Sequence, residues 1–202
     1  MPSIITHAAV PLALWCAADR GRIPPRLLAA GVIAAMLPDA DVLAFALHIP
    51  YADAFGHRGA SHSLLFASVL AALAAVLAFL GSRRPWSAVS CQPRLAPTKP
   101  GPTVASTVQA AVFVFVCAAS HPLLDAMTSG GLGVALAWPW SEQRFFAPWR
   151  PIRVSPFAPQ FFSARGLATL LSELRWVWLP LAGAVVAWKL IQPAPAAPRD
   201  PS

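Results

Sequence analysis

The chain has 202 residues and a net charge of +7; 57% of its residues are hydrophobic, only 11% are charged, and its mean hydropathy is +0.59. Soluble domains average roughly 45–50% apolar and about 25% charged residues, and a chain of this length cannot bury such an apolar excess. The composition therefore excludes an ordinary soluble globule and a disordered chain, and because the cations are spread over short loops it also argues against nucleic-acid binding. It predicts an integral membrane protein.

Five hydrophobic segments follow one another along the chain. They cover residues 4–18, 27–37 (resuming over 42–49 after Pro38), 64–80, 104–120 and 176–191. A spanning helix needs about 20 apolar residues, so the third and fourth segments fit best, and the fifth has interfacial Arg, Trp and Lys residues at its ends. We predict an all-α integral membrane bundle of four or five hydrophobic helices, of which two to five span the bilayer.

Polar and proline-rich stretches separate these segments. Residues 82–102 are predicted to form a flexible loop, and residues 138–164 are predicted to form a capping loop at the membrane face. Residues 192–202 have the composition of a Pro/Ala-rich tail. We therefore expect a single membrane-embedded domain over residues 1–191.

Histidine and aspartate gather in four short clusters at the ends of the apolar segments. An ionisable residue at membrane depth is costly and is a functional hypothesis by default. The clusters hold four of the five histidines and three of the six aspartates: Thr6-His7; Leu37-Pro38-Asp39-Ala40-Asp41; His57-Arg58-Gly59-Ala60-Ser61-His62-Ser63; and His121-Pro122-Leu123-Leu124-Asp125. Imidazoles and carboxylates are donors suited to zinc, manganese or iron, so the joint pattern predicts a metal site.

Each cluster also has a purely structural interpretation. His7 fits an interfacial residue, and the two aspartates after Pro38 fit a turn and a helix cap. His121 and Asp125 share one helix face and fit a simple hydrogen-bonded pair as well as a metal site. His48 lies outside every cluster and is expected to be structural.

The four clusters resemble the YdjM-type family of predicted membrane-bound, metal-dependent hydrolases. The segment Trp138-Pro139-Trp140-Ser141-Glu142-Gln143-Arg144-Phe145 is similar to that family's Trp-Pro-Phe-Ser-acid-x-Arg element, and the match runs from about residue 3 to residue 146. More distantly, the order of the clusters is similar to the helical fold of trinuclear-zinc phospholipase C and nuclease. No histidine follows His121, which favours one or two ions over three. The resemblance implies a metallohydrolase of the bacterial inner membrane that acts on phosphoester or lipid-like substrates.

On this basis we expect Asp39, His62, His121 and Asp125 to surround one divalent ion, with zinc the first choice and manganese or iron as alternatives. A second, weaker ion would use His7 with Asp125 as a bridge, and His57 or Asp41 would complete either shell. A bound ion makes hydroxide available near neutral pH. Asp41 is the candidate general base if Asp39 is a ligand, and Arg58 is the candidate clamp for a phosphate, with a lipid headgroup contact as its alternative role.

A second class of function uses the same ligands. A non-catalytic membrane metal-binding or transport protein would need polar residues deep within its spanning segments, flanked by broken helices. The segment 64–80 contains only Ser68 as a polar residue, and the candidate ligands sit at helix ends. This distribution favours the hydrolase, with the lipid bilayer and a small-molecule or lipid substrate as its partners.

Overall fold

The computed structural model describes residues 1–19, 22–82, 104–156 and 160–192, and their regular structure is helical. The helices in chain order are α1 (Ile4–His7), α2 (Ala9–Ala17), α3 (Pro25–Met36), η1 (Leu37–Val42), α4 (Leu43–Ala46), η2 (Ala60–His62), α5 (Leu64–Ser82), α6 (Val104–Ala126), η3 (Gln160–Phe162), α7 (Ala164–Glu173), η4 (Leu174–Trp178) and α8 (Leu179–Ile191). Within these ranges β-pairing is limited to two isolated bridges, which join Thr128 to Ile152 and Val134 to Phe145. The predicted all-α class is confirmed.

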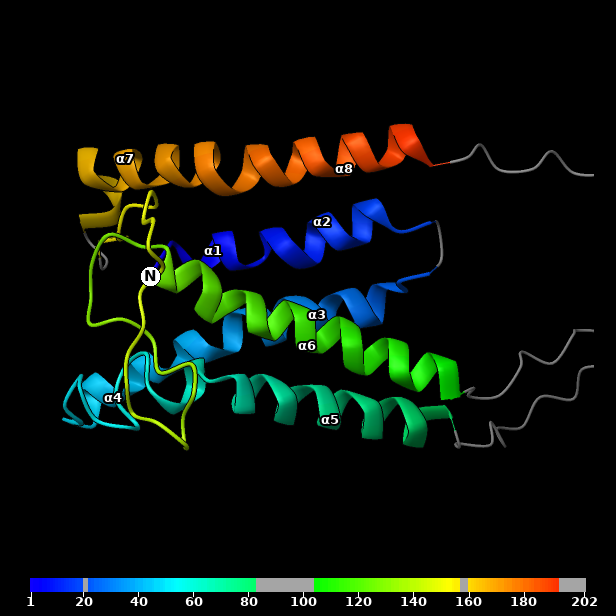
Figure 1. The fold of residues 1–202 in the computed structure, drawn as a ribbon, viewed down its shortest axis with the longest axis horizontal. Helices are drawn as coiled ribbons and strands as arrows, with labels where there is room; N and C mark the ends of the chain where they lie inside the picture. Colours follow the sequence, from blue (N-terminus) through cyan, green and yellow to red (C-terminus); the bar gives the residue numbers. More distant parts are fainter. Residues whose placement is uncertain (20–21, 83–103, 157–159, 193–202) are drawn as a thin grey trace, which may run out of the picture.

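Four helical stretches in the described part of the chain are long and apolar enough to cross a membrane. They are Pro25–Ala46, Leu64–Gly81, Ala105–Ala126 and Ala164–Ile191, and a shorter apolar helix covers Ile4–Ala17. Figure 1 shows the long helices running side by side, with α7 and α8 next to α1 and α2 at one edge and α5 at the other. The non-helical segments around α4 and after α6 gather at one end of the bundle, on the left of the figure.

Small residues hold the centre of the bundle together. Ala34 and Ala35 of α3 and Ala67 of α5 are buried against Phe113 and Cys117 of α6. A side chain at Gly31 would collide with the Phe113 ring, so the glycine lets α3 approach α6 closely. Close approach through small residues is typical of helix pairs in membranes, and here it brings the ends of α3 and α6 together.

Three helix boundaries differ from the sequence-based expectation. The second segment does not stop at Pro38 but continues as the 3₁₀ turn η1, since a proline is accepted in the first turn of a helix. Helix α6 runs past residue 120 to Ala126 and contains Pro122. The last helical stretch begins at Ala164 rather than at residue 176. The predicted start was too late because Arg165, Glu173 and Arg175 lower the mean hydropathy of the first half of this stretch. The predicted loop from residue 83 onward and the tail from residue 193 onward lie outside the described residues.

Candidate metal centre

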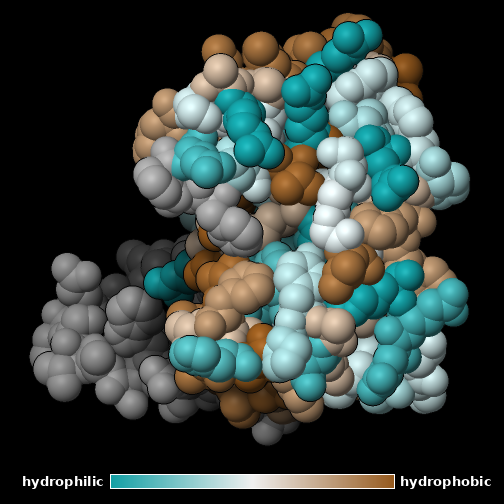
Figure 2. All heavy atoms as spheres, turned by 90° about the vertical axis from the view of Figure 1, so that its left-hand side faces the viewer, coloured by the Kyte–Doolittle hydropathy of each residue, from teal (hydrophilic) through white to brown (hydrophobic). Residues whose placement is uncertain are grey.

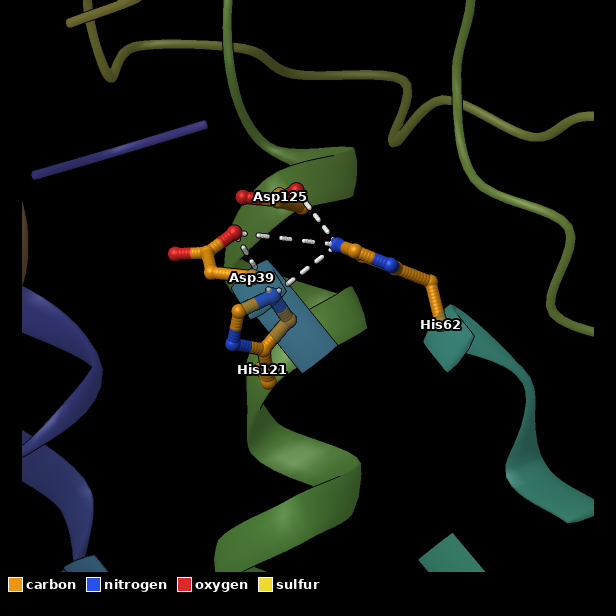
Figure 3. A group of neighbouring side chains, drawn as sticks. All are labelled: Asp39, His62, His121 and Asp125. Atoms are coloured by element: carbon orange, nitrogen blue, oxygen red, sulfur yellow. Dashed lines mark hydrogen bonds and ion pairs between the residues drawn. The ribbon is translucent and has the colours of Figure 1, made fainter. Parts of the chain in front are cut away.

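Four side chains from three elements converge at the end of the bundle (Figure 3). Asp39 comes from η1, His62 from η2, and His121 and Asp125 lie one turn apart on α6. The four residues are only 0 to 4% exposed. Each offers one ligand atom, and these atoms all lie within 4.8 Å of one another.

The donor atoms are close enough together to surround a single ion. His121 Nε2 lies 3.0 Å from His62 Nε2 and 3.4 Å from Asp39 Oδ1, and His62 Nε2 lies 3.3 Å from Asp125 Oδ2. Donors at about 2.0–2.2 Å from a tetrahedral zinc ion are roughly 3.3–3.6 Å apart. The distances from His121 to Asp39 and from His62 to Asp125 fall in this range, whereas the two imidazole nitrogens are closer and His62 Nε2 is 4.0 Å from Asp39 Oδ1, so the donors would shift by a few tenths of an ångström around an ion.

His7 lies on the other side of the two carboxylates. Its Nε2 is 3.7 Å from Asp39 Oδ2 and 3.7 Å from Asp125 Oδ1, and its ring stacks on the ring of His121. Each carboxylate thus turns one oxygen toward His7 and the other toward the pair of His62 and His121. This is the geometry of carboxylates that can bridge two neighbouring cation positions.

Unpartnered polar atoms distinguish this group from an ordinary hydrogen-bonded cluster. Among the described residues, the buried side-chain nitrogen and oxygen atoms without a hydrogen-bond partner all belong to His7, Asp39, Arg58 and Asp125. Buried polar groups are otherwise nearly always satisfied, because leaving one unpaired is costly. Both oxygens of Asp39 and of Asp125 are in this set; Asp125 Oδ2 is ion-paired with Arg58 Nε at 3.0 Å, whereas the Asp39 oxygens have only the neighbouring imidazoles, so a cation fits the donors present here.

The two ligand histidines are oriented by partners on their far sides. His121 Nδ1 donates to the carbonyl oxygen of Ala35 at 2.7 Å, and His62 Nδ1 lies 3.1 Å from Asp41 Oδ2. Such contacts fix the ring and leave the other nitrogen, Nε2, free to bind a metal. In both residues Nε2 is the atom that points into the group.

Asp41 and His57 form a layer behind His62. Asp41 accepts hydrogen bonds from the Arg58 backbone N–H and the Ser61 hydroxyl, and His57 Nδ1 lies 2.5 Å from its Oδ1. Both carboxylate oxygens are therefore engaged. The structure places His57 against Asp41 and against the ring of Tyr51, not among the four gathered donors.

Arg58 is buried beside the group. Its Nε is 3.0 Å from Asp125 Oδ2, and its two terminal nitrogens donate to Gly130 O and Thr128 Oγ1. Its backbone φ is 63°, a left-handed conformation that is uncommon for a residue with a side chain and that clusters at functional sites. The guanidinium therefore contacts Asp125 and the segment after α6 rather than an open surface.

The electrostatic field of the site attracts positive charge. Burial acts to lower the pKa of His62, but hydrogen bonds to Asp125 and Asp41, and the charges of both, outweigh it and raise this pKa to about 9. The same carboxylates would stabilise a metal cation at this position.

The site is closed to solvent in this conformation. A cavity of about 400 Å³ lies elsewhere, near the other end of the bundle, where Leu14, Phe113 and Trp188 contribute to its wall. It contains none of the residues of the metal centre.

The YdjM inner membrane protein family matches residues 1–196. The chain belongs to this family. The inner membrane protein YbcI of Escherichia coli (strain K12) is 46% identical over 181 residues, which cover 89% of this chain and 92% of that protein. No solved structure matches the chain. The predicted family and the predicted inner-membrane location are confirmed, and the spanning helices place this YdjM-family protein in a lipid bilayer.

Sequence reasoning missed several residues around the centre. Thr128 and Gly130, which hold Arg58, follow the His121-x-x-x-Asp125 motif directly but received no role. Glu173 was also passed over, although it is a buried carboxylate in a helix apolar enough to span a membrane. The cost of a charge at membrane depth is the signal that would have identified it.

Proposed function

We propose that this YdjM-family protein is a membrane-bound metal-dependent hydrolase in which Asp39, His62, His121 and Asp125 hold a divalent cation. The carrying observation is the convergence of two imidazole nitrogens and two buried carboxylates at one point, where neither oxygen of Asp39 has a hydrogen-bond donor. Nitrogen and oxygen donors in this combination suit zinc best, with manganese or iron as alternatives. The ion would lower the pKa of a coordinated water toward neutrality and polarise a phosphoryl or carbonyl oxygen.

His7 extends the donor set. Because Asp39 and Asp125 each turn one oxygen toward it, His7 would serve as a further ligand to the same ion or as the terminal ligand of a second, more weakly held ion. In the second arrangement both carboxylates bridge.

Asp41 and Arg58 support the ligands. We assign to Asp41 the orientation of His62 rather than proton transfer, because both of its oxygens already have partners. We assign to Arg58 the orientation of Asp125, since its terminal nitrogens are held by Gly130 and Thr128. A role of Arg58 as a phosphate clamp would require it to leave these partners.

The position of the site supports a phosphoester or lipid-like substrate. Figure 2 looks onto the end of the bundle that carries the site, and hydrophilic and hydrophobic residues are mixed across this face. Trp140 and Trp149 are exposed, and Arg150 and Arg175 lie over the rings of Phe146 and Trp176. Aromatic and cationic residues of this kind mark the headgroup level of a bilayer, where phosphate esters of lipids lie.

The test combines metal analysis with a substrate screen. The purified full chain in detergent is analysed for bound metal and assayed on phosphomonoesters, phosphodiesters and phospholipids, together with Asp125→Asn and the matched control His48→Ala. We expect stoichiometric metal and hydrolysis in the wild type and in His48→Ala, since His48 is exposed and is not among the gathered donors, and loss of both in Asp125→Asn. If the wild type binds metal but hydrolyses none of these substrate classes, the hydrolase proposal is overturned in favour of a metal-binding or transport protein. A wild type that binds no metal would overturn both.

A further inference from the structure

Glu173 is a buried carboxylate outside the metal centre. It ends α7 and is 1% exposed, although the stretch Ala164–Ile191 is the least buried of the four candidate spans. Its Oε1 accepts a hydrogen bond from the Ser3 backbone N–H at 2.5 Å, and its Oε2 accepts from the hydroxyls of Ser3 at 2.6 Å and Thr6 at 2.7 Å. All three donors belong to one turn at the start of α1.

The π-helix that follows Glu173 brings a second group to the same turn. Trp178 Nε1 donates to Thr6 Oγ1 at 3.1 Å. Residues five apart point about 140° away from each other around an α-helix. Within η4 the hydrogen bonds run from i+5 to i, as between Leu179 N and Leu174 O, so residues five apart come closer to one face. The irregular turn thereby lets Glu173 and Trp178 contact Thr6 together.

The turn that they hold carries a residue of the metal centre. His7 follows Thr6 directly, and α1 is only four residues long with no side-chain cap of its own at Ser3. Both nitrogens of His7 lack hydrogen-bond partners, so His7 has no orienting contact of the kind that Ala35 gives His121. Its position against Asp39 and Asp125 therefore depends on the backbone of this turn and on the stacking of its ring against His121.

We propose that Glu173 is a positioning residue of the metal centre, which fixes the Ser3–Thr6 turn and so holds His7 against Asp39 and Asp125. The inference rests on the proposed metal site, and it gives the last helical stretch a role in positioning one residue of that site. Glu173 acts through His7 and touches none of the four gathered donors.

The substitution Glu173→Gln keeps the size of the side chain. The carboxylate only accepts hydrogen bonds, and all three of its partners donate, whereas an amide turns its NH₂ group toward at least one of these donors. Thr169→Val is the matched control. Thr169 is equally buried on the same helix, and its hydroxyl bonds to Val154 O and Arg165 O rather than to α1.

The experiment is a double-mutant cycle on zinc affinity. Full-length wild type, Glu173→Gln, His7→Ala and the double variant are titrated with Zn²⁺ against a competing chelator in detergent, with thermal unfolding as a check on folding. We expect Glu173→Gln to weaken the affinity about tenfold or more, as loss of an outer-shell partner does. In the His7→Ala background the same substitution should change nothing, and Thr169→Val should bind zinc like the wild type.

Two results would overturn the inference while leaving the metal site standing. One is a zinc affinity of Glu173→Gln equal to that of the wild type. The other is an equal loss of zinc affinity in the presence and absence of the His7 side chain, which would show a purely structural role of Glu173. A wild type without zinc affinity overturns the proposed function itself, and is seen before any variant is compared. If Glu173→Gln does not fold, Trp178→Phe replaces it. This substitution removes the Nε1–H donor to Thr6 together with part of the ring that packs near Ala9 and Val177, so the dependence of its effect on His7 is the deciding readout, and it should weaken zinc binding less than Glu173→Gln.

Discussion

Asp125 joins the two sides of the metal centre. Its Oδ1 faces His7 at 3.7 Å, while its Oδ2 faces His62 at 3.3 Å and Arg58 Nε at 3.0 Å. Asp125→Asn keeps the shape but removes the anion of a proposed direct ligand, so we expect bound metal and hydrolysis to be lost together. Folding stability should also decrease, because the buried Arg58 loses its counter-charge. Metal analysis and turnover in one detergent preparation measure both effects.

His57→Ala is the comparison variant for Asp125→Asn. Since His57 contacts Asp41 and not the gathered donors, its loss should be milder. Full metal and rate in Asp125→Asn, with loss of both in His57→Ala, would show that the loop before α5 holds the primary ligand instead.

Asp41 provides a separate test at the same scale. Asp41→Asn leaves all four gathered donors in place but replaces the charged acceptor of His62 Nδ1 with a neutral amide, so the ring is held less firmly, with the Ser61 hydroxyl 3.0 Å from Nδ1 as its other partner. We expect metal affinity to fall about 10- to 100-fold while a bound ion still supports hydrolysis. Chelator competition gives the affinity, and the rate at saturating metal separates this role from that of a general base. A rate that stays low at saturating metal would restore Asp41 as the base.

At the scale of elements, the segment after α6 holds Arg58 in place. Gly131 has a φ of 91°, and a Cβ there would lie 2.7 Å from Arg58 Nη1 and 2.9 Å from the hydroxyl of Tyr51. We expect Gly131→Ala to lower both the unfolding midpoint and the metal affinity, because it strains the backbone and displaces the buried guanidinium.

Gly133→Ala is the matched control for this substitution. Its φ is 84°, so it carries the same backbone strain, but its Cβ would meet the backbone of Phe145 and not Arg58. It should lower the unfolding midpoint without changing zinc affinity. Equal affinities in the two alanine variants would show that the Gly131 contact does not reach the metal centre.

The sequence was most informative where a single element carries the pattern. His121 and Asp125 are four residues apart, and helical geometry alone puts them on one face. That Asp39 meets this face depends on how α3 packs against α6, through Gly31 and Phe113, and that His62 meets it depends on how α5 packs there through Ala67. Periodicity encodes neither contact. The left-handed backbone of Arg58 likewise has distant partners, since its N–H donates to Asp41 and its carbonyl oxygen accepts from the Ala135 N–H.

Helix ends were predicted less well than helix centres. A prediction from hydropathy ends a helix where polar residues begin. In the structure His121 and Asp125 of α6 and Glu173 of α7 nevertheless lie within helices, because their side chains are buried against the site or against α1. The functional residues therefore lie where the hydropathy signal is weakest.

At the scale of the whole molecule, a bound ion would link elements that are distant in sequence. The gathered donors come from η1, η2 and α6, so removal of the ion should loosen the end of the bundle. A ligand at a hundred times its Kd stabilises the folded state by about 2.7 kcal/mol. We expect a chelator to lower the thermal unfolding midpoint of the wild type and to have little effect on Asp125→Asn. The same shift in both proteins would place the stabilising metal elsewhere.

The placement of Glu173 and Trp178 has a consequence for the order in which the protein is built. The proposed ligands all lie within the first 125 residues, whereas the two residues that hold the Ser3–Thr6 turn lie beyond residue 172. Chains emerge from the ribosome with the N-terminal part first, so the ligand-bearing helices are available before the last helix has been made. If Glu173 has the proposed role, assembly of the donors and fixation of His7 would be separate events in biogenesis, and insertion of the helical stretch Ala164–Ile191 would complete the proposed site.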